Sequence, residues 1–453
     1  MSVTIIGAGL AGSELALQLA KRGVSVRIFE KKAYAPTPAQ VSTDYAELVC
    51  SNSFRAASPD NAVGAIKEEM RILGSEIMEV ADACAVPAGG ALAVNRERFA
   101  AEVTRRLLSH PLIEIIEAEV DELPAAGETV IATGPLTGEG LSGAIARATG
   151  AEKMYFYDAI APIVAADSID QSLVFEASRW GKGSADYLNC PLDEPAYRAF
   201  LEAVAAAEKV TPRDFEEERF FEGCLPIEVM AARGPETLRF GCMKPVGLDD
   251  PRTGRWAHAV VQLRAENREK TAYNMVGFQT RMKWGAQKEV FRQIPGLAEA
   301  EFLRFGSIHR NTYIDSPSLL DEGLRLRSAP HLRFAGQITG VEGYVESTAC
   351  GLNLALIMLG ERAGLVPSLL PPETALGALH RHVLGSERTD ERHVPSNVHW
   401  GMVPRLQVRA KKSERKRLMG ERALAACRAW WSVRRPLLDA PPSLENDRGR
   451  ATV

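Results

Sequence analysis

The residues of this chain best suited to covalent chemistry are its seven cysteines, because a thiolate is a strong nucleophile and a good metal ligand. They are Cys50, Cys84, Cys190, Cys224, Cys242, Cys350 and Cys427. An odd number at scattered spacings, without a C-x-x-C pair, is typical of free thiols in a reducing compartment and argues against disulfides or a zinc site. The eight histidines include no H-E-x-x-H or similar spacing, so we expect no bound metal. By residue type alone, most lone cysteines are small buried hydrophobes.

A second group of residues indicates a nucleotide. Three glycines at G-x-G-x-x-G spacing follow a short apolar run at the N-terminus, in the stretch Gly7-Ala8-Gly9-Leu10-Ala11-Gly12. A helical pattern continues to about residue 22, and a second apolar run ends in Glu30, 18 residues beyond Gly12. Strand, tight turn, helix, strand and acid in this order form the dinucleotide-binding fingerprint.

Each part of this fingerprint has a physical role. Gly7 makes the tight turn, Gly9 lets the backbone approach a pyrophosphate, and Gly12 lets helix and strand pack closely. The helix N-terminus offers unpaired N–H groups and a partial positive charge to the phosphates. Glu30 can accept hydrogen bonds from ribose hydroxyls. The sequence therefore predicts an α/β, Rossmann-type domain that binds a dinucleotide.

Two further glycine-bearing turns are expected beside the same ligand. Residues 129–135 form a buried-strand pattern that ends in Gly134, where the missing side chain lets the chain pass close to a cofactor. Residues 332–344 predict a strand that runs into a turn with Gly336, Gln337 and Gly340, followed by a helix over 346–359. The N-terminus of that helix is a second candidate contact with the cofactor, on the flavin side in this class of fold.

Composition places the chain among soluble globular proteins. With 453 residues, 25% of them charged and 46% apolar, the chain is long enough for two or three domains. No 18-residue run is free of charges or helix breakers, and the N-terminus lacks a basic signal region, so we expect a cytoplasmic protein without membrane attachment. The net charge is −4, but residues 405–435 hold 11 lysines and arginines against two glutamates, a local balance of +9. This stretch predicts either a polyanionic partner such as nucleic acid or a solvated basic helix.

The domain organisation follows from changes of pattern along the chain. We expect a first part of the dinucleotide-binding domain at 1–180, an inserted α/β domain at 181–310, and the returning part of the first domain at 311–400. Helices are expected at 62–78 and 99–108, and a connector at 362–400. Residues 401–453 are expected to be a basic extension, disordered after residue 445.

Six stretches in order give the sequence a family resemblance. They are AELVCSNS (46–53), VPAGGALAV (86–94), YLNCP (187–191), FEGCLPIE (221–228), NMVGFQT (274–280) and AGQITGVEGY (335–344). The chain resembles, from residue 3 to about 405, the bacterial FAD- and folate-dependent tRNA uracil-5-methyltransferases, the TrmFO family. The resemblance implies FAD, reduced by NADH or NADPH, and 5,10-methylenetetrahydrofolate as co-substrate. It implies tRNA as the partner, methylated at the T-loop uridine, position 54, and no obligate protein partner is evident.

The resemblance also assigns roles to individual residues. Cys224 corresponds to the thiol that attacks C6 of uracil, and Cys50 to a thiol beside the flavin that acts as a base. An ordinary thiol is only a few per cent ionised at neutral pH, so neighbouring groups must tune both. His309 and Tyr344 are candidates to line the folate and flavin pocket, against the alternative of ordinary core residues. Arg264, like Lys244, is expected either at an anionic ligand or as a plain surface charge.

Alternatives remain at this point. The same chemistry on a uridine of 23S rRNA is one, a wobble-uridine flavoprotein similar to MnmG is a second, and a flavin-bearing RNA-binding protein without methyl transfer is a third. The sequence departs from the family pattern at residues 38–41, where a histidine is usual, and at Cys242, where proline is usual. If the basic stretch 405–435 holds RNA, its removal is expected to weaken binding and flatten the salt dependence.

Overall fold

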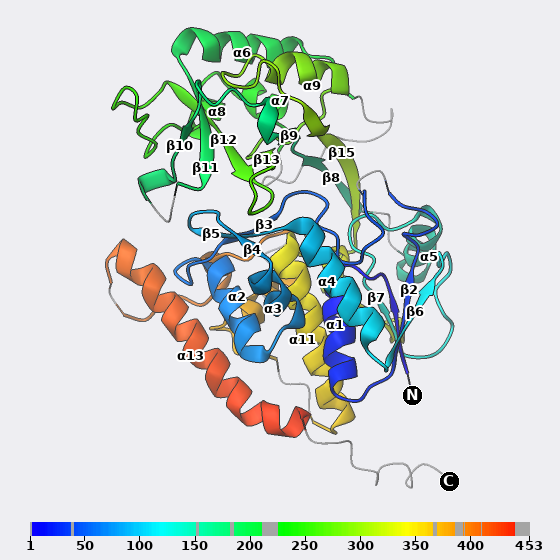
Figure 1. Cartoon of the computed structure of the whole chain (residues 1–453). Helices are drawn as coiled ribbons and strands as arrows, with labels where there is room; N and C mark the ends of the chain where they lie inside the picture. Colours follow the sequence, from blue (N-terminus) through cyan, green and yellow to red (C-terminus); the bar gives the residue numbers. More distant parts are fainter. Residues whose placement is uncertain are drawn as a thin grey trace, which may run out of the picture.

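The protein consists of two lobes joined by a two-stranded ribbon, as the computed structural model shows (Figure 1). The structure describes residues 2–37, 40–150, 154–181, 185–210, 225–365, 369–385, 393, 395–408 and 410–439, with the main chain alone at 154–160, 307–311 and 412–413. The ribbon pairs β8 (Met154–Ile160) with β15 (Ser307–Tyr313) in antiparallel register. Cys224 and the segment after residue 445 lie outside the described residues.

The first lobe is built on a six-stranded sheet in the order β16-β17-β7-β1-β2-β6. All neighbours pair in parallel except β16, which is antiparallel to β17. The strands are β1 (Val3–Ile6), β2 (Val26–Glu30), β6 (Ile113–Glu117), β7 (Thr129–Ile131), β16 (Arg325–Leu326) and β17 (Ala329–Phe334). Because parallel strands end at the same sheet edge, the residues after β1, β2, β7 and β17 converge there. The expected α/β, Rossmann-type fold is confirmed.

Helices cover this sheet, and a small antiparallel sheet extends the lobe toward the ribbon. The small sheet contains β3 (Ser53–Ala56), β4 (Ala85–Val86) and β5 (Ala91–Val94). The helices are α1 (Leu10–Lys21), α2 (Ala62–Leu73), α3 (Glu76–Ala83), α4 (Arg96–Ser109), α5 (Glu139–Thr149), α10 (Ser316–Leu319), α11 (Tyr344–Arg362), α12 (Ala375–Val383) and α13 (Lys412–Leu438), with 3-10 turns η4 (Gln337–Thr339) and η5 (Trp400–Met402). The helix expected at 62–78 is two helices, because Gly74 adopts φ +79° and ends α2.

The second lobe is built on an antiparallel sheet in the order β10-β11-β12-β13-β9-β14. Its strands are β9 (Ile163–Ala165), β10 (Phe175–Glu176), β11 (Tyr187–Leu192), β12 (Ala259–Ala265), β13 (Ala272–Met275) and β14 (Phe302–Arg304). Its helices are α6 (Glu194–Ala206), α7 (Ile227–Ala232), α8 (Thr237–Phe240) and α9 (Trp284–Phe291), with 3-10 turns η1 (Ala166–Ser168) and η2 (Arg179–Gly181). Strands on both sides of residue 181 belong to this sheet, since β9 and β10 precede that residue and β11 to β14 follow it. We expect a domain boundary at residue 181, and this boundary stays a prediction.

Each lobe has its own hydrophobic core. The larger core joins the parallel sheet to α1, α2, α11 and part of α13, and the second core lies between the antiparallel sheet and its helices. None of the described helices is long and apolar enough to span a bilayer. The described residues also hold no cluster of three or more histidine, cysteine or carboxylate side chains that could bind a metal ion.

Candidate functional site

The turn between β1 and α1 can only be made by glycines. Gly7 has φ +105°, and a Cβ at this position would lie 2.6 Å from the Ala132 carbonyl oxygen. A Cβ at Gly12 would lie 2.0 Å from the Gly7 carbonyl oxygen, closer than any real contact. A Cβ at Gly9, by contrast, would have no described atom within 4 Å, so this residue borders open space. The loop is therefore tight on the side of the sheet and open on the side where a ligand would lie.

Glu30 is held at the end of β2 by the neighbouring backbone. Its Oε2 accepts a hydrogen bond from the Ala8 N–H at 2.7 Å, and its Oε1 accepts one from the Lys32 N–H at 3.0 Å. Each carboxylate oxygen has a further lone pair. The half-buried carboxylate can therefore keep this position and still accept hydrogen bonds from two ribose hydroxyls.

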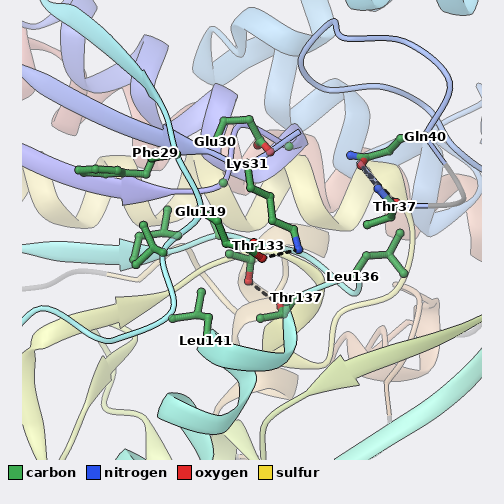
Figure 2. Close-up of a pocket in the computed structure, with 17 residues that line it drawn as sticks. Phe29, Glu30, Lys31, Thr37, Gln40, Glu119, Thr133, Leu136, Thr137 and Leu141 are labelled. Atoms are coloured by element: carbon green, nitrogen blue, oxygen red, sulfur yellow. Dashed lines mark hydrogen bonds and ion pairs between the residues drawn. The ribbon is translucent and has the colours of Figure 1, made fainter. Parts of the chain in front are cut away.

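A pocket with about 630 Å³ of empty space opens beside this turn (Figure 2). Lys31 and Glu119 approach each other across it with an Nζ to Oε1 distance of 3.1 Å, and the hydroxyls of Thr133 and Thr137 lie 2.7 Å apart. The lining residues are Ile6, Gly7, Gly9, Phe29, Glu30, Lys31, Thr37, Gln40, Ala118, Glu119, Val120, Ala132, Thr133, Leu136, Thr137, Gly138 and Leu141.

The first turn of α1 is suited to a phosphate. The helix begins at Leu10 with Gly9 as its N-cap, and within the described structure no side chain caps it and no acidic residue occupies its first turn. Its first N–H groups therefore have no intrahelical partner and carry the positive end of the helix dipole. Ala8, Leu10 and Ala11 are buried along this turn, as is Gly12. A pyrophosphate can be bound here by backbone groups alone.

The other glycine-bearing turns lie at the same sheet edge. Gly134 follows β7 with φ +65°, and Gly336 follows β17 with φ +80°. A Cβ at Gly336 would lie 2.7 Å from the Cβ of Ala11, so this turn packs directly on the start of α1. Gln337 donates to Glu342 at 2.7 Å, and Gly340 adopts φ +85°. The structure thus brings these predicted residues to one edge of the sheet.

Tyr344, the first residue of α11, holds the loop that carries Cys50. Its hydroxyl accepts hydrogen bonds from the N–H groups of Cys50 at 2.6 Å and Ser51 at 3.1 Å. Burial is the main cause that raises the pKa of the Tyr344 hydroxyl, and the nearby Cys50 raises it further. It therefore stays neutral at physiological pH. Tyr344 therefore lies next to the half-buried Cys50, and its place in the folate and flavin pocket stays a prediction.

Positive charge gathers around the same loop. Arg96, at the start of α4, donates to the Leu48 carbonyl at 2.8 Å and forms a bidentate pair with Glu266 of the second lobe at 2.7 and 3.0 Å. Arg264 of β12 is buried and donates to Asn52 at 2.8 Å. Burial lowers the pKa of the Arg264 guanidinium, and the Cys50 thiol counteracts this effect.

Arg304 of β14 carries a third guanidinium group that interacts electrostatically with Cys50. Its pKa is lowered by burial and then by Arg96, whereas Tyr344 and Cys50 raise it. Three guanidinium groups, one of them paired with Glu266, therefore lie near the loop that carries Cys50.

The remaining predicted residues are placed as follows. His309 lies on β15 opposite Asp158, and its side chain is outside the described residues, as is all of Cys224. Lys244 is exposed, but Arg264 is buried between the lobes, so the alternative of a plain surface charge is wrong for Arg264. By residue type we expect Cys84, Cys242, Cys350 and Cys427 to serve packing and Cys190 to have a structural role; all five are buried except Cys242, which is half-buried.

Sequence reasoning missed the residues that join the lobes at this site. Asn52 was part of a recognised stretch, but its role is visible only in the fold, where its amide donates to the Ala265 carbonyl at 3.0 Å and accepts from Arg264. Arg96 and Glu266 are 170 residues apart in sequence. No local pattern pairs such residues. Lys31, Glu119 and Thr133 of the pocket were missed for the same reason.

Comparisons with known proteins agree with this architecture. The family model described as Glucose inhibited division protein A matches residues 2–364. The structure of Aquifex aeolicus GidA superposes with a TM-score of 0.68 at 16% identity, covering 97% of this chain and 74% of that chain, and it shows the shared fold.

Relatives at much higher identity share one name, Methylenetetrahydrofolate–tRNA-(uracil-5-)-methyltransferase TrmFO. The protein of that name from Geobacter sulfurreducens is 56% identical over 95% of this chain and 98% of its own length. Its counterpart from Heliobacterium modesticaldum is 55% identical over 94% of this chain and 96% of its own length. The chain belongs to the TrmFO family.

Proposed function

We propose that this chain methylates C5 of the T-loop uridine, position 54, of tRNA. The one-carbon donor is 5,10-methylenetetrahydrofolate, and FAD reduced by NADH or NADPH supplies the reducing equivalents. The observation that carries this proposal is the 56% identity, over nearly the whole of both chains, to a relative that bears the name of this activity. The site geometry supports it, because the loop that carries Cys50 contacts both the turn after β1, through the Ala46 N–H and the Ala8 carbonyl, and Tyr344 at the start of α11.

The residues present fit FAD. Gly7 and Gly12 leave no room for a side chain where the loop must be tight, and Gly9 borders open space. The uncapped start of α1 suits the pyrophosphate, and Glu30 suits the ribose hydroxyls. Gly134, Gly336, Gln337 and Gly340 would hold the remainder of the group at the same sheet edge. When bound, FAD supplies a hydride.

The protein supplies the nucleophile and the base. C5 of uracil is a poor nucleophile until a thiolate adds to C6, and Cys224 is the residue that we assign to this step. The resulting enolate carbon attacks the one-carbon electrophile. A base, which we assign to Cys50, then removes the C5 proton while tetrahydrofolate leaves, which gives an exocyclic methylene. Addition of a hydride to this methylene forms the methyl group, expels the Cys224 thiolate from C6 and restores the C5–C6 double bond. Tyr344 positions Cys50 through the two backbone hydrogen bonds to its hydroxyl.

Two arginines are proposed to hold the Cys50 loop in place. Arg96 donates to the Leu48 carbonyl, and Arg264 donates to Asn52. His309 and Tyr344 are proposed to line the space for the flat rings of folate and flavin. The uridine is packed inside the folded tRNA and must be extruded before its C5 and C6 can react.

The test combines the purified protein, an unmodified tRNA transcript, methylenetetrahydrofolate and NADPH, with 5-methyluridine mapped by mass spectrometry. We expect product at position 54, and none from Cys224→Ala or Cys50→Ala. Cys190→Ala is the matched control, because Cys190 is a fully buried thiol in a strand of the second core. Product in 23S rRNA alone would change the target but keep the chemistry. A wobble-uridine product, or no product in either RNA, would refute the proposal.

A further inference from the structure

Trp180 in the second lobe is an outlier in two respects. It has φ +62°, a left-handed conformation that bulky residues rarely adopt. Its side chain is nevertheless 62% exposed, so burial of the indole offsets the unfavourable backbone only in part. Outliers of this kind persist where the surrounding structure holds them and are concentrated at functional sites.

The surroundings of Trp180 fix the indole in place. The backbone N–H of Trp180 donates to the Gly247 carbonyl at 2.8 Å, and the indole lies directly over Gly247, where a Cβ would be 2.7 Å from the ring. Trp256, itself 49% exposed, meets it edge to face with ring centroids 6.5 Å apart. The two tryptophans therefore form a rigid aromatic platform that faces solvent.

Cations and carboxylates both occur in the segments around this platform: Asp249 is exposed, and Asp250 is paired with Arg252 at 2.8 Å. Arg179 donates to the Lys244 carbonyl at 2.9 Å, to the Val246 carbonyl and to the Gln262 amide oxygen at 3.0 Å. It forms no ion pair with a carboxylate among the described residues. Lys244 and Arg255 are exposed, and neither is ion-paired within the described part of the chain. The platform thus has cations available for a partner with negative charge.

The platform is also connected to the space between the lobes. The turn that carries Trp180 joins β10 to β11, and at its end Asp186 accepts a hydrogen bond from the Gly89 N–H of the first lobe at 2.6 Å. Next to it, Tyr187 pairs across the sheet with Arg264, which reaches Asn52 beside Cys50. A long ligand bound at the Cys50 loop could therefore continue along this edge of the second lobe, on the β10 side in Figure 1.

We propose that Trp180 and Trp256 bind unstacked bases of the RNA substrate, with Arg179, Lys244 and Arg255 at the neighbouring phosphates. This proposal rests on the proposed function, which makes tRNA the substrate. Aromatic side chains bind nucleobases by stacking, and loops with extruded bases are the usual targets of such recognition. A rigid indole beside unpaired cations matches this chemistry.

The test measures the Kd of unmodified tRNA transcript for the FAD-loaded protein and its variants. Trp180→Ala is expected to raise the Kd about 5- to 100-fold, as found for the loss of one base-stacking partner, and Trp180→Phe is expected to restore most of the affinity. The matched control is Trp284→Ala. Trp284 is 67% exposed but begins α9 and stacks on Phe305, away from β10 in Figure 1.

Two further measurements separate recognition from structure. Trp180→Gly should raise the melting temperature, because glycine adopts positive φ without strain, and should still weaken tRNA binding. Lys244→Gln combined with Arg255→Gln should reduce the slope of log Kd against log salt by about 1 for each phosphate that the variant no longer binds. A purely structural role of Trp180 would make the glycine variant less stable and leave the salt slope unchanged.

The outcomes distinguish this inference from the proposed function. Wild-type protein that does not bind tRNA would overturn both. Wild-type protein that methylates tRNA, with Trp180→Ala binding as tightly as Trp284→Ala, would overturn only the platform. A Trp180→Ala variant with an altered oligomeric state and unchanged tRNA affinity would identify the surface as a contact between copies of the chain, and would likewise overturn it.

Discussion

The ion pair between Arg96 and Glu266 should be a main support of the contact between the lobes. Both side chains are largely buried, with exposed fractions of 14% and 9%, and two hydrogen bonds of 2.7 and 3.0 Å join them. Glu266→Ala would leave the Arg96 guanidinium buried without its counter-charge. Arg96 would keep its bond to the Leu48 carbonyl, so the Cys50 loop would lose only part of its anchor.

The expected magnitude follows from the burial of the pair. Removal of one partner from a buried ion pair costs about 3–5 kcal/mol, mostly because the remaining charge is uncompensated. In a domain of 150–250 residues each kcal/mol lowers the melting temperature by about 2–4 °C, so we expect a decrease of about 6 °C or more. Arg96→Met combined with Glu266→Ala should recover part of this loss, because no charge is then left unpaired.

Scanning calorimetry of the apo and FAD-loaded forms would measure the effect. Glu269→Ala is the matched control, since Glu269 lies in the same turn but is exposed and has no ion pair among the described residues. The control should change the melting temperature by less than about 2 °C, as is usual for surface substitutions. Equal melting temperatures for Glu266→Ala and Glu269→Ala would refute the argument that the pair joins the lobes.

Three further outcomes are expected. Gly12→Ala should weaken FAD retention about 5- to 150-fold, because its Cβ would lie 2.0 Å from the Gly7 carbonyl oxygen and overpacking costs about 1–3 kcal/mol; normal flavin absorbance after dialysis would contradict this expectation. Tyr344→Phe should make Cys50 more accessible to iodoacetamide, because the Cys50 N–H loses the buried hydroxyl that accepts its hydrogen bond. Unchanged alkylation of Cys50 in peptide maps would contradict this expectation. Burial raises the pKa of Glu69 from 4.5 to about 8. The neutral carboxyl is therefore favoured in the folded state, so the unfolding free energy should fall as pH rises from about 4.5 to 8, and Glu69→Gln should flatten that profile.

The local geometry of the site follows from short stretches of sequence. The turn at Gly7 to Gly12 and the acid at Glu30 are fixed by steric and hydrogen-bonding demands that act within one βαβ unit. Gly336 lies at the expected sheet edge because a strand followed by a glycine turn ends at the cofactor edge of a parallel sheet. What the sequence did not provide was the pairing of distant residues, such as Asn52 with Arg264, because such contacts depend on how the lobes are placed.

The connector and the basic extension show a second limit. Residues 362–400 were expected to be a connector, but they include α12, whose N-terminus is bound by the buried Glu69 of α2 at 2.8 Å from two backbone N–H groups. The signal for a helix was the apolar spacing of Leu376 and Leu379, which the neighbouring prolines and histidines obscured. Tertiary contacts therefore stabilise a segment whose local pattern is weak.

Residues 405–435 are the other case, and their structure changes how their charge should be tested. Most of this stretch belongs to α13, which packs along α2 with Ala423, Cys427 and Trp431 buried in the core of the first lobe. Its removal would expose that core, so a loss of RNA binding after truncation would say little about charge. The deletion that the sequence suggested is therefore the wrong experiment.

Substitutions on the exposed face of α13 avoid this difficulty. Arg415, Lys416 and Arg428 are exposed, and none is ion-paired to a carboxylate within the described residues. Their combined replacement by glutamine, a good helix former, should leave the melting temperature within about 2 °C of wild type. If the helix binds RNA phosphates, the slope of log Kd against log salt for tRNA should become shallower by about 3. An unchanged slope would show that α13 is a solvated basic helix with a structural role and does not bind the phosphates.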